Sequence, residues 1–131
     1  ALVDLDTVKP GLTQYDLGDC LRSCCNRAKE DDQYQESHFD LEPAHSVLSG
    51  YLSEMRALLT YNDFAYFYPA IHLLSFELGI RFFTDFLEGN RYFKSSYPEQ
   101  NLRRALAQFG LTASIETQEQ PLRALINELT W

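Results

Sequence analysis

Apolar side chains recur every three or four residues through most of this 131-residue chain, separated by polar and charged positions. That spacing places the apolar side chains on one face of a helix. Four such series are present, over about residues 15–28, 43–59, 62–88 and 98–129. Gly110 and Pro121 lie inside the last series, where we expect them to bend or break the helix. The pattern predicts an all-α fold of about four helices.

The third series is apolar on nearly every face between Phe64 and Phe86, and Gly89 follows it as a typical helix-ending residue. A helix that is apolar all round is packed on several sides, so we expect this one at the centre of the molecule. Gly18, inside the first series, costs a helix about 1 kcal/mol relative to alanine. We therefore expect another part of the backbone to approach the first helix closely at Gly18.

The chain opens differently, with Leu2, Val3 and Leu5 in a short strand-like run. Alternation along a strand places Asp4 and Asp6 on one face. A strand needs neighbours, yet almost nothing else in the sequence is typical of a strand. We therefore interpret the chain as the C-terminal piece of a longer protein whose remaining strands precede it. The alternative is a complete small helical protein with an extended N-terminal arm.

The composition restricts the partners that the chain can have. Eleven Lys and Arg residues against nineteen Asp and Glu give a net charge of −8, which disfavours nucleic acid and anionic membrane surfaces. The longest run without charged residues, 64–76, is shorter than the roughly 20 residues that cross a bilayer. The first residues also lack the pattern of a secretory leader. No nucleic-acid or membrane partner is expected.

Three cysteines lie close together in the first series, at Cys20, Cys24 and Cys25. An odd number of clustered thiols suits a reducing compartment better than a disulfide framework, so we expect a cytoplasmic protein. Their spacing matches no tetrahedral zinc motif. We expect them to be buried and to act as small apolar side chains.

Two groups of charged residues are candidates for chemistry. Asp4 and Asp6, on one face of a strand end, present oxygen ligands of the kind that hard cations prefer, although solvated acids are the simpler interpretation. Arg81 lies on one helical face with Glu77 and Asp85, and all three share that face with Glu88. The face is either a solvent-exposed ladder of ion pairs or the wall of a cleft in which these acids orient Arg81 toward a polar ligand.

The segment of residues 90–97 combines aromatic rings with amide, hydroxyl and basic groups. A sugar ring needs a flat apolar surface to stack on and polar groups for its rim. The segment is either such a surface or a linker between two helices whose aromatic rings fill the core.

Several blocks of the sequence resemble the aminoglycoside-phosphotransferase-like kinases, and within them the N-acetylhexosamine 1-kinase branch. The first block is LVDLDTVKPGLTQYDLGDCLRSCCNRA, and the later ones are ELGIRFFTDFLEGNRYFK and YPEQNLRRALAQF. The blocks occur in the same order as in that branch, and together they extend to about Phe109. The resemblance implies that residues 1–131 form the helical C-terminal lobe of a two-lobed, protein-kinase-like fold.

The resemblance also implies roles for individual residues. Asp4 matches the aspartate that binds Mg²⁺ against the ATP phosphates, and Asp16 matches a structural brace for the active-site loops. Arg81 and Tyr92 match positions that contact the sugar. Glu119 departs from the aromatic residue expected near its position.

The activity implied is transfer of the ATP γ-phosphate to a hydroxyl of an N-acetylhexosamine-type sugar. The N-lobe and the catalytic loop have no counterpart in these 131 residues, so we expect the chain alone to be inactive. Its partners would be the sugar, ATP and the N-terminal part of its own protein. A non-enzymatic helical protein-interaction domain is the competing hypothesis, with the aromatic residues around Tyr92 and Tyr97 as its contact surface.

Overall fold

The computed structural model describes residues 5, 8–28 and 37–130, and every named element among them is helical. The elements are α1 Thr13–Cys24, α2 Leu41–Met55, the 3₁₀ helix η3 Arg56–Leu58, α3 Tyr61–Ala65, α4 Phe67–Leu87, α5 Gln100–Thr117 and α6 Glu119–Thr130. The predicted all-α class is confirmed, but the described residues form six α-helices where about four are expected, because the third and last series each divide in two. Of the predicted N-terminal strand only Leu5 is described, and Asp4 and Asp6 lie outside the described residues.

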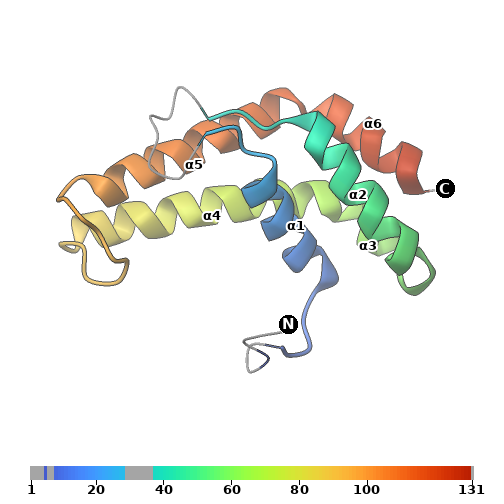
Figure 1. The fold of residues 1–131 in the computed structure, drawn as a ribbon, viewed down its shortest axis with the longest axis horizontal. Coiled ribbons are helices and arrows are strands. Elements are labelled where there is room, and N and C mark those ends of the chain that lie inside the picture. The colour runs from blue at the N-terminus through green and yellow to red at the C-terminus, as the bar shows by residue number, and fades with distance from the viewer. Residues whose placement is uncertain (1–4, 6–7, 29–36, 131) are drawn as a thin grey trace.

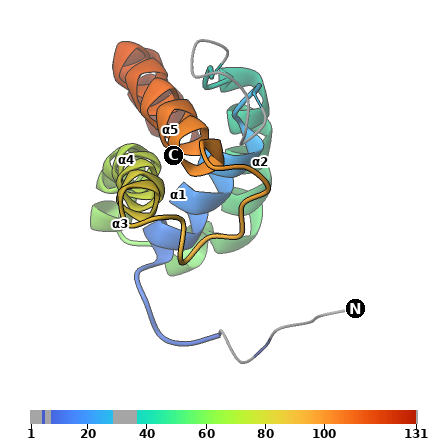
Figure 2. The ribbon, with the colours of Figure 1, turned by 90° about the vertical axis from the view of Figure 1, so that its left-hand side faces the viewer.

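The two longest helices, α4 and α5, lie side by side in opposite directions along the length of the molecule, joined by the loop of residues 88–99 (Figure 1). Helix α1 crosses α4 on another side, and α2 packs on α6 (Figures 1 and 2). Helix α4 therefore contacts helices on two sides, and it occupies the centre of the fold as the sequence predicts.

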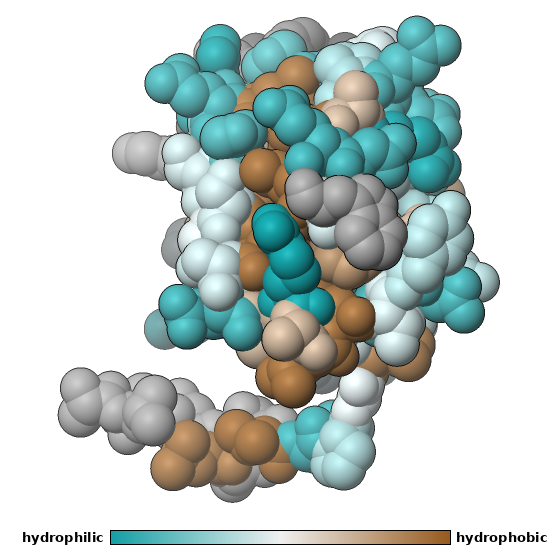
Figure 3. Space-filling view, turned by 90° about the vertical axis from the view of Figure 1, so that its right-hand side faces the viewer, coloured by the Kyte–Doolittle hydropathy of each residue, from teal (hydrophilic) through white to brown (hydrophobic). Residues whose placement is uncertain are grey.

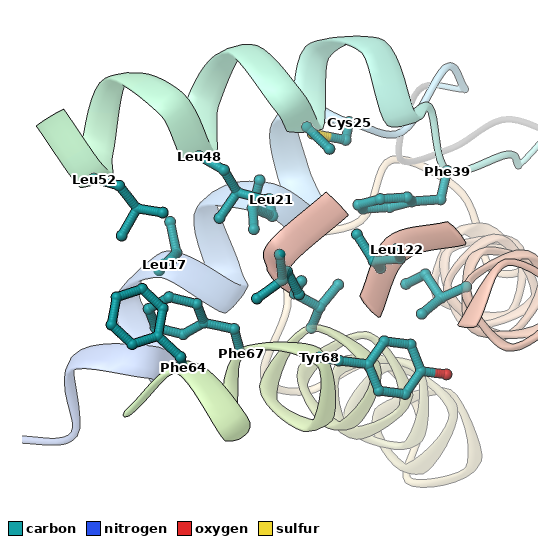
Figure 4. Close-up of a cluster of buried hydrophobic side chains, with 14 of the residues drawn as sticks. Leu17, Leu21, Cys25, Phe39, Leu48, Leu52, Phe64, Phe67, Tyr68 and Leu122 are labelled. Carbon is teal, nitrogen blue, oxygen red and sulfur yellow. The ribbon is translucent and has the colours of Figure 1, made fainter. Parts of the chain in front are cut away.

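The core lies where α1, α2, α4, α5 and α6 meet, and α3 adds Phe64 to it. Figure 4 shows side chains from these helices pointing toward one another, with Phe64 and Phe67 in edge contact at 5.4 Å between ring centres. Burying each large apolar side chain stabilises the fold by about 1.5–3 kcal/mol. The fully buried apolar side chains include Leu21, Phe39, Leu48, Ile71, Leu111, Ile115 and Leu122.

Two glycines allow the helices to approach closely. A Cβ atom on Gly18 would lie 3.1 Å from the backbone carbonyl carbon of Ala70 and 3.0 Å from Cδ1 of Leu74, both in α4. A Cβ atom on Gly79 would lie 2.6 Å from the ring of Phe109 in α5. The predicted close approach at Gly18 is confirmed.

The last helical series breaks at Gln118, close to Pro121, where a bend or break is expected, and no break occurs at Gly110. Gly110 lies inside the continuous helix α5, whereas Gln118 separates α5 from α6. The Gln118 side chain donates a hydrogen bond from Nε2 to the backbone oxygen of Phe39 at 2.8 Å, which fixes the turn against a distant segment. Pro121 lies in the first turn of α6, where the missing N–H group has no helical partner to lose.

The cysteines also differ from the prediction, because only Cys25 is buried. Helix α1 packs through the face that carries Leu17, Gly18 and Leu21. Cys20 and Cys24 lie beside that face rather than in it and are exposed. The prediction that all three cysteines are buried is therefore wrong for Cys20 and Cys24.

Apolar side chains are exposed both near the end of α6 and before α1. At the end of the molecule where α6 terminates, apolar side chains form a band between hydrophilic borders (Figure 3). Residues 8–12, which lead into α1, extend away from the helices (Figure 1), and Leu5, Val8 and Leu12 are exposed. Over the residues that the structure describes, no helix has the length and apolar character required to cross a membrane.

Candidate functional site

Helix α4 ends in a left-handed turn that directs the chain back across the helix end. The Gly89 N–H donates to the Phe86 carbonyl at 3.2 Å, and the Asn90 N–H donates to the Asp85 carbonyl at 2.8 Å. Gly89 has φ +90° and Asn90 φ +61°, values that glycine and asparagine adopt more readily than other residues. This Schellman arrangement ends the helix and starts the loop at a fixed angle.

The carboxylate of Asp85 fixes the backbone of that loop. Its Oδ1 atom accepts hydrogen bonds from the backbone N–H groups of Arg91 at 3.0 Å and Tyr92 at 2.8 Å. Its Oδ2 atom accepts from the N–H of Phe93 at 3.0 Å and from Nδ2 of Asn101 at 2.9 Å. Asp85 is only 4% exposed, so these four donors replace the water that a free carboxylate would bind.

The same bonds determine the charge state of Asp85. Burial by itself raises the pKa of a carboxyl group, but the three backbone N–H donors stabilise the ionised form more strongly. The net result is a pKa of Asp85 below its ordinary value. The side chain is therefore a negative charge at neutral pH, fully occupied in positioning the loop.

Two side chains of helix α5 also hold the loop in place. Asn101 is fully buried, and its Nδ2 donates both to Asp85 and, at 3.1 Å, to Oδ1 of Asn90. Arg104 donates from Nη1 to Oδ1 of Asn101 at 3.0 Å and to the backbone oxygen of Lys94 at 2.9 Å. The loop is thus attached to the ends of both long helices.

Arg81 contacts aromatic rings of the loop. Its guanidinium carbon lies 5.8 Å from the centre of the Tyr92 ring and 5.5 Å from that of Phe93, within the range of cation–π attraction. Phe93 in turn packs on Phe82, with ring centres 4.6 Å apart.

The predicted ion pairs of Arg81 with Glu77 and Asp85 do not occur among the described residues. The prediction is wrong for Asp85 because the loop returns over α4 and its N–H groups occupy that carboxylate. Asp85 is buried, whereas Glu77, Arg81 and Glu88 are exposed as a solvent-facing stripe requires.

An open hollow of about 360 Å³ lies between the loop and the outer side of α4. We call it the α4-end hollow. It is lined by Ile80, Arg81, Thr84, Asp85, Glu88, Tyr92 and Phe93. Arg81 supplies hydrogen-bond donors, Glu88 acceptors, and Thr84 a hydroxyl group that does both. Tyr92, 76% exposed, supplies a flat ring. This combination suits a small molecule with many hydroxyl groups and an apolar face.

The structure therefore brings together two of the predicted site residues, Arg81 and Tyr92, on one hollow. Asp16 lies elsewhere, exposed in the first turn of α1, where a carboxylate favours the helix dipole. Glu119 also lies elsewhere and forms an ion pair of 2.8 Å with Arg123. The role of Asp16 as a brace remains a prediction.

Sequence reasoning missed Thr84, Ile80 and Asn101 as parts of this region. Thr84 and Ile80 are spaced by four residues on α4, and Arg81 marks their side of the helix, so helical periodicity carried a usable signal. The sequence carried no signal for Asn101, because its place in the site depends on the path of the loop.

Within the described residues, no group of three or more His, Cys, Asp or Glu side chains is arranged to bind a metal ion. The predicted Mg²⁺ ligand Asp4 is not among these residues. No protein-family model matches the chain.

Proposed function

We propose that this chain supplies the sugar-binding part of an ATP-dependent phosphotransferase that acts on a hydroxyl of an N-acetylhexosamine-type sugar. The observation that supports the proposal is the meeting of Arg81 and Tyr92 in the α4-end hollow, 5.8 Å from guanidinium carbon to ring centre. The resemblance assigns these two residues to the sugar, and they come from two different elements, α4 and the loop after it.

The hollow suits a sugar for physical reasons. One face of a pyranose ring carries C–H groups that pack against an exposed aromatic ring such as that of Tyr92. The hydroxyl groups at the rim can accept from Arg81 and donate to Glu88. Asp85 and Asn101 hold the loop in place before the sugar arrives, so less conformational entropy is lost on binding.

The nucleotide would be bound by the N-terminal part of the same protein. In this proposal Asp4 binds the Mg²⁺ that neutralises charge on the ATP phosphates, and the enzyme works in the cytoplasm. Mg²⁺ is usually bound by one or two carboxylates together with substrate phosphates that are already positioned. For this reason the 131-residue chain alone is proposed to bind sugar without transferring phosphate.

Sugar binding by the chain is the direct test. We expect N-acetylglucosamine to shift the backbone amide NMR signals of residues 91–93 in a saturable manner. Arg81→Ala and Tyr92→Ala should each weaken binding by roughly tenfold or more, because each removes about 1.4 kcal/mol or more of contact energy. Tyr61→Ala is a matched control, since Tyr61 is 73% exposed, close to the exposure of Tyr92, but lines a different pocket.

The proposal fails if N-acetylglucosamine shifts no signal in the loop, or if Tyr61→Ala weakens binding as much as Tyr92→Ala. The same sample incubated with ATP and Mg²⁺ should form no ADP. Sugar-dependent ADP formation by the 131-residue chain would contradict the proposed division of labour between the two parts.

The second candidate function, a helical protein-interaction domain, is favoured by one face of α4. Every third or fourth residue along this helix is a large apolar side chain between 39% and 67% exposed, a spacing that suits packing against another helix. We call this the α4 outer face, and it consists of Leu73, Phe76, Ile80, Phe83 and Leu87. Sugar binding at the α4-end hollow distinguishes the two functions, because an interaction domain does not require it.

A further inference from the structure

Two exposed thiols on α1 lie in direct contact. The Sγ atoms of Cys20 and Cys24 are 3.8 Å apart, within the range of a thiol–thiol hydrogen bond. The two residues are one helical turn apart, so their side chains project from the same side of α1. They add nothing to the core, because that side of α1 faces solvent.

The geometry of α1 disfavours a disulfide bond between Cys20 and Cys24. A disulfide bond needs Cβ atoms about 3.5–4.5 Å apart and sulfur atoms about 2.05 Å apart. Residues i and i+4 of a regular helix hold their Cβ atoms about 5–6 Å apart. Closing the bond would therefore distort α1, and the rigid packing of Gly18 on α4 opposes such a change.

The sulfur–sulfur distance fits a bridging metal ion instead. A tetrahedral thiolate site has metal–sulfur bonds of about 2.3 Å, so the edge between two of its sulfur atoms is about 3.8 Å long. Cys20 and Cys24 already have this separation. Binding would need no movement of the helix backbone, which favours chelation over separate binding by two thiols.

The local charge is suitable for a cation. Asp19 lies next to Cys20, and its carboxylate binds Arg22 Nε at 2.9 Å, which offsets that positive charge. Burial and the neighbouring thiol of Cys24 raise the pKa of Cys20 above its ordinary value. A metal ion must therefore displace protons: each S–H bond breaks as a metal–sulfur bond forms, and two protons pass to the solvent.

We propose that Cys20 and Cys24 form a two-thiolate site on α1 for a soft, tetrahedral metal ion of the Zn²⁺ or Cd²⁺ type. Water or a small solution ligand completes the coordination. The site is separate from the α4-end hollow and does not depend on the proposed function.

The test is titration of the metal-free chain, kept reduced with a phosphine, with Cd²⁺. Thiolate-to-metal charge-transfer absorption should saturate at one ion per chain. Cys20→Ser and Cys24→Ser should each weaken binding about 100-fold, because each leaves one thiolate and removes the chelate. Cys25→Ala is the control: it removes the remaining thiol of the cluster, which is buried while the pair is exposed, so it should leave binding unchanged.

A second measurement covers the case in which the buried Cys25 variant does not fold. On the unaltered chain, Cd²⁺ should protect Cys20 and Cys24 equally from alkylation, as mapped by mass spectrometry. The proposal is overturned if either single serine variant keeps the affinity of the unaltered chain, if Cys25→Ala alone abolishes binding, or if Cd²⁺ protects neither exposed thiol.

Discussion

At the scale of single residues, Asp85 is the side chain on which the candidate site depends. Its two oxygen atoms accept four hydrogen bonds, three of them from consecutive backbone N–H groups of the loop. The resemblance predicted Arg81 and Tyr92, but nothing predicted this role of Asp85. An acid on a helical face looks like a partner for the arginine one turn away, and only the returning path of the loop shows that its partners are backbone amides.

Exchange of Asp85 for asparagine tests this role. The amide has nearly the same shape, but its NH₂ group would face N–H donors and leave some of them without an acceptor. We expect Asp85→Asn to lower the midpoint of thermal unfolding and to speed hydrogen exchange at the amides of residues 91–93 well beyond that in α2. Unchanged exchange at these three amides would contradict the role assigned to Asp85.

The lowered pKa of Asp85 also predicts a dependence on pH. A carboxyl group whose pKa is lower in the folded than in the unfolded chain adds stability above its ordinary pKa of about 4. That stability is lost as the pH falls through the pKa of the folded state. In urea unfolding between pH 6 and pH 3, the difference in unfolding free energy between the unaltered chain and Asp85→Asn should therefore shrink below about pH 4. If the unfolding free energies of the two proteins instead change in parallel with pH, the assigned role of the Asp85 charge is contradicted.

At the scale of helices, the sequence located the helical segments because each buries a periodic apolar face. It located the break between α5 and α6 only approximately, at Pro121 rather than Gln118, since that turn depends on a hydrogen bond to the carbonyl of Phe39, 79 residues away. It also failed for Cys20 and Cys24, because polar Asp16 and Asp19 share their side of α1 and the apolar character of cysteine is too weak to decide burial. Long-range contacts determine such details.

Two glycines in different helices should respond oppositely to alanine. Gly18→Ala places a Cβ atom about 3.1 Å from the backbone of α4, and we expect a loss of about 1–2 kcal/mol after the gain in helix propensity is subtracted. Gly50 in α2 is exposed with nothing within 4 Å of a new Cβ atom, so Gly50→Ala should add about 0.5–1 kcal/mol. Urea unfolding measures both values, and equal signs for the two variants would contradict the close approach of α1 and α4.

At the scale of the whole molecule, the α4 outer face is a row of large apolar side chains that the other described helices leave exposed. It continues onto a pocket formed with the start of α1, which is lined by Leu12, Tyr15, Tyr66, Pro69 and Leu73 among others. Contiguous apolar surface of this kind marks a place where another structure packs. This is the face on which the proposed helical interaction domain would bind its partner.

A charge on this face should reduce its affinity for apolar molecules without unfolding the chain. We expect Leu73→Glu to lower the fluorescence of a bound apolar dye severalfold, while the unfolding free energy changes by no more than about 0.5 kcal/mol, because Leu73 is 49% exposed. Leu58→Glu is the control, since Leu58 is 75% exposed on η3 and lies outside this face. If Leu58→Glu reduces the fluorescence equally, the dye does not report the α4 outer face.

The hydrogen bonds between Asp85 and the loop backbone have an evolutionary consequence. Because its partners at residues 91–93 are main-chain groups, its hold on the loop does not depend on the exposed side chains at positions 91 and 92. Position 92 can thus accept other amino acids while the scaffold stays constant. Relatives or laboratory libraries that vary this position against an unchanged aspartate would be expected to diverge in ligand preference before they diverge in fold.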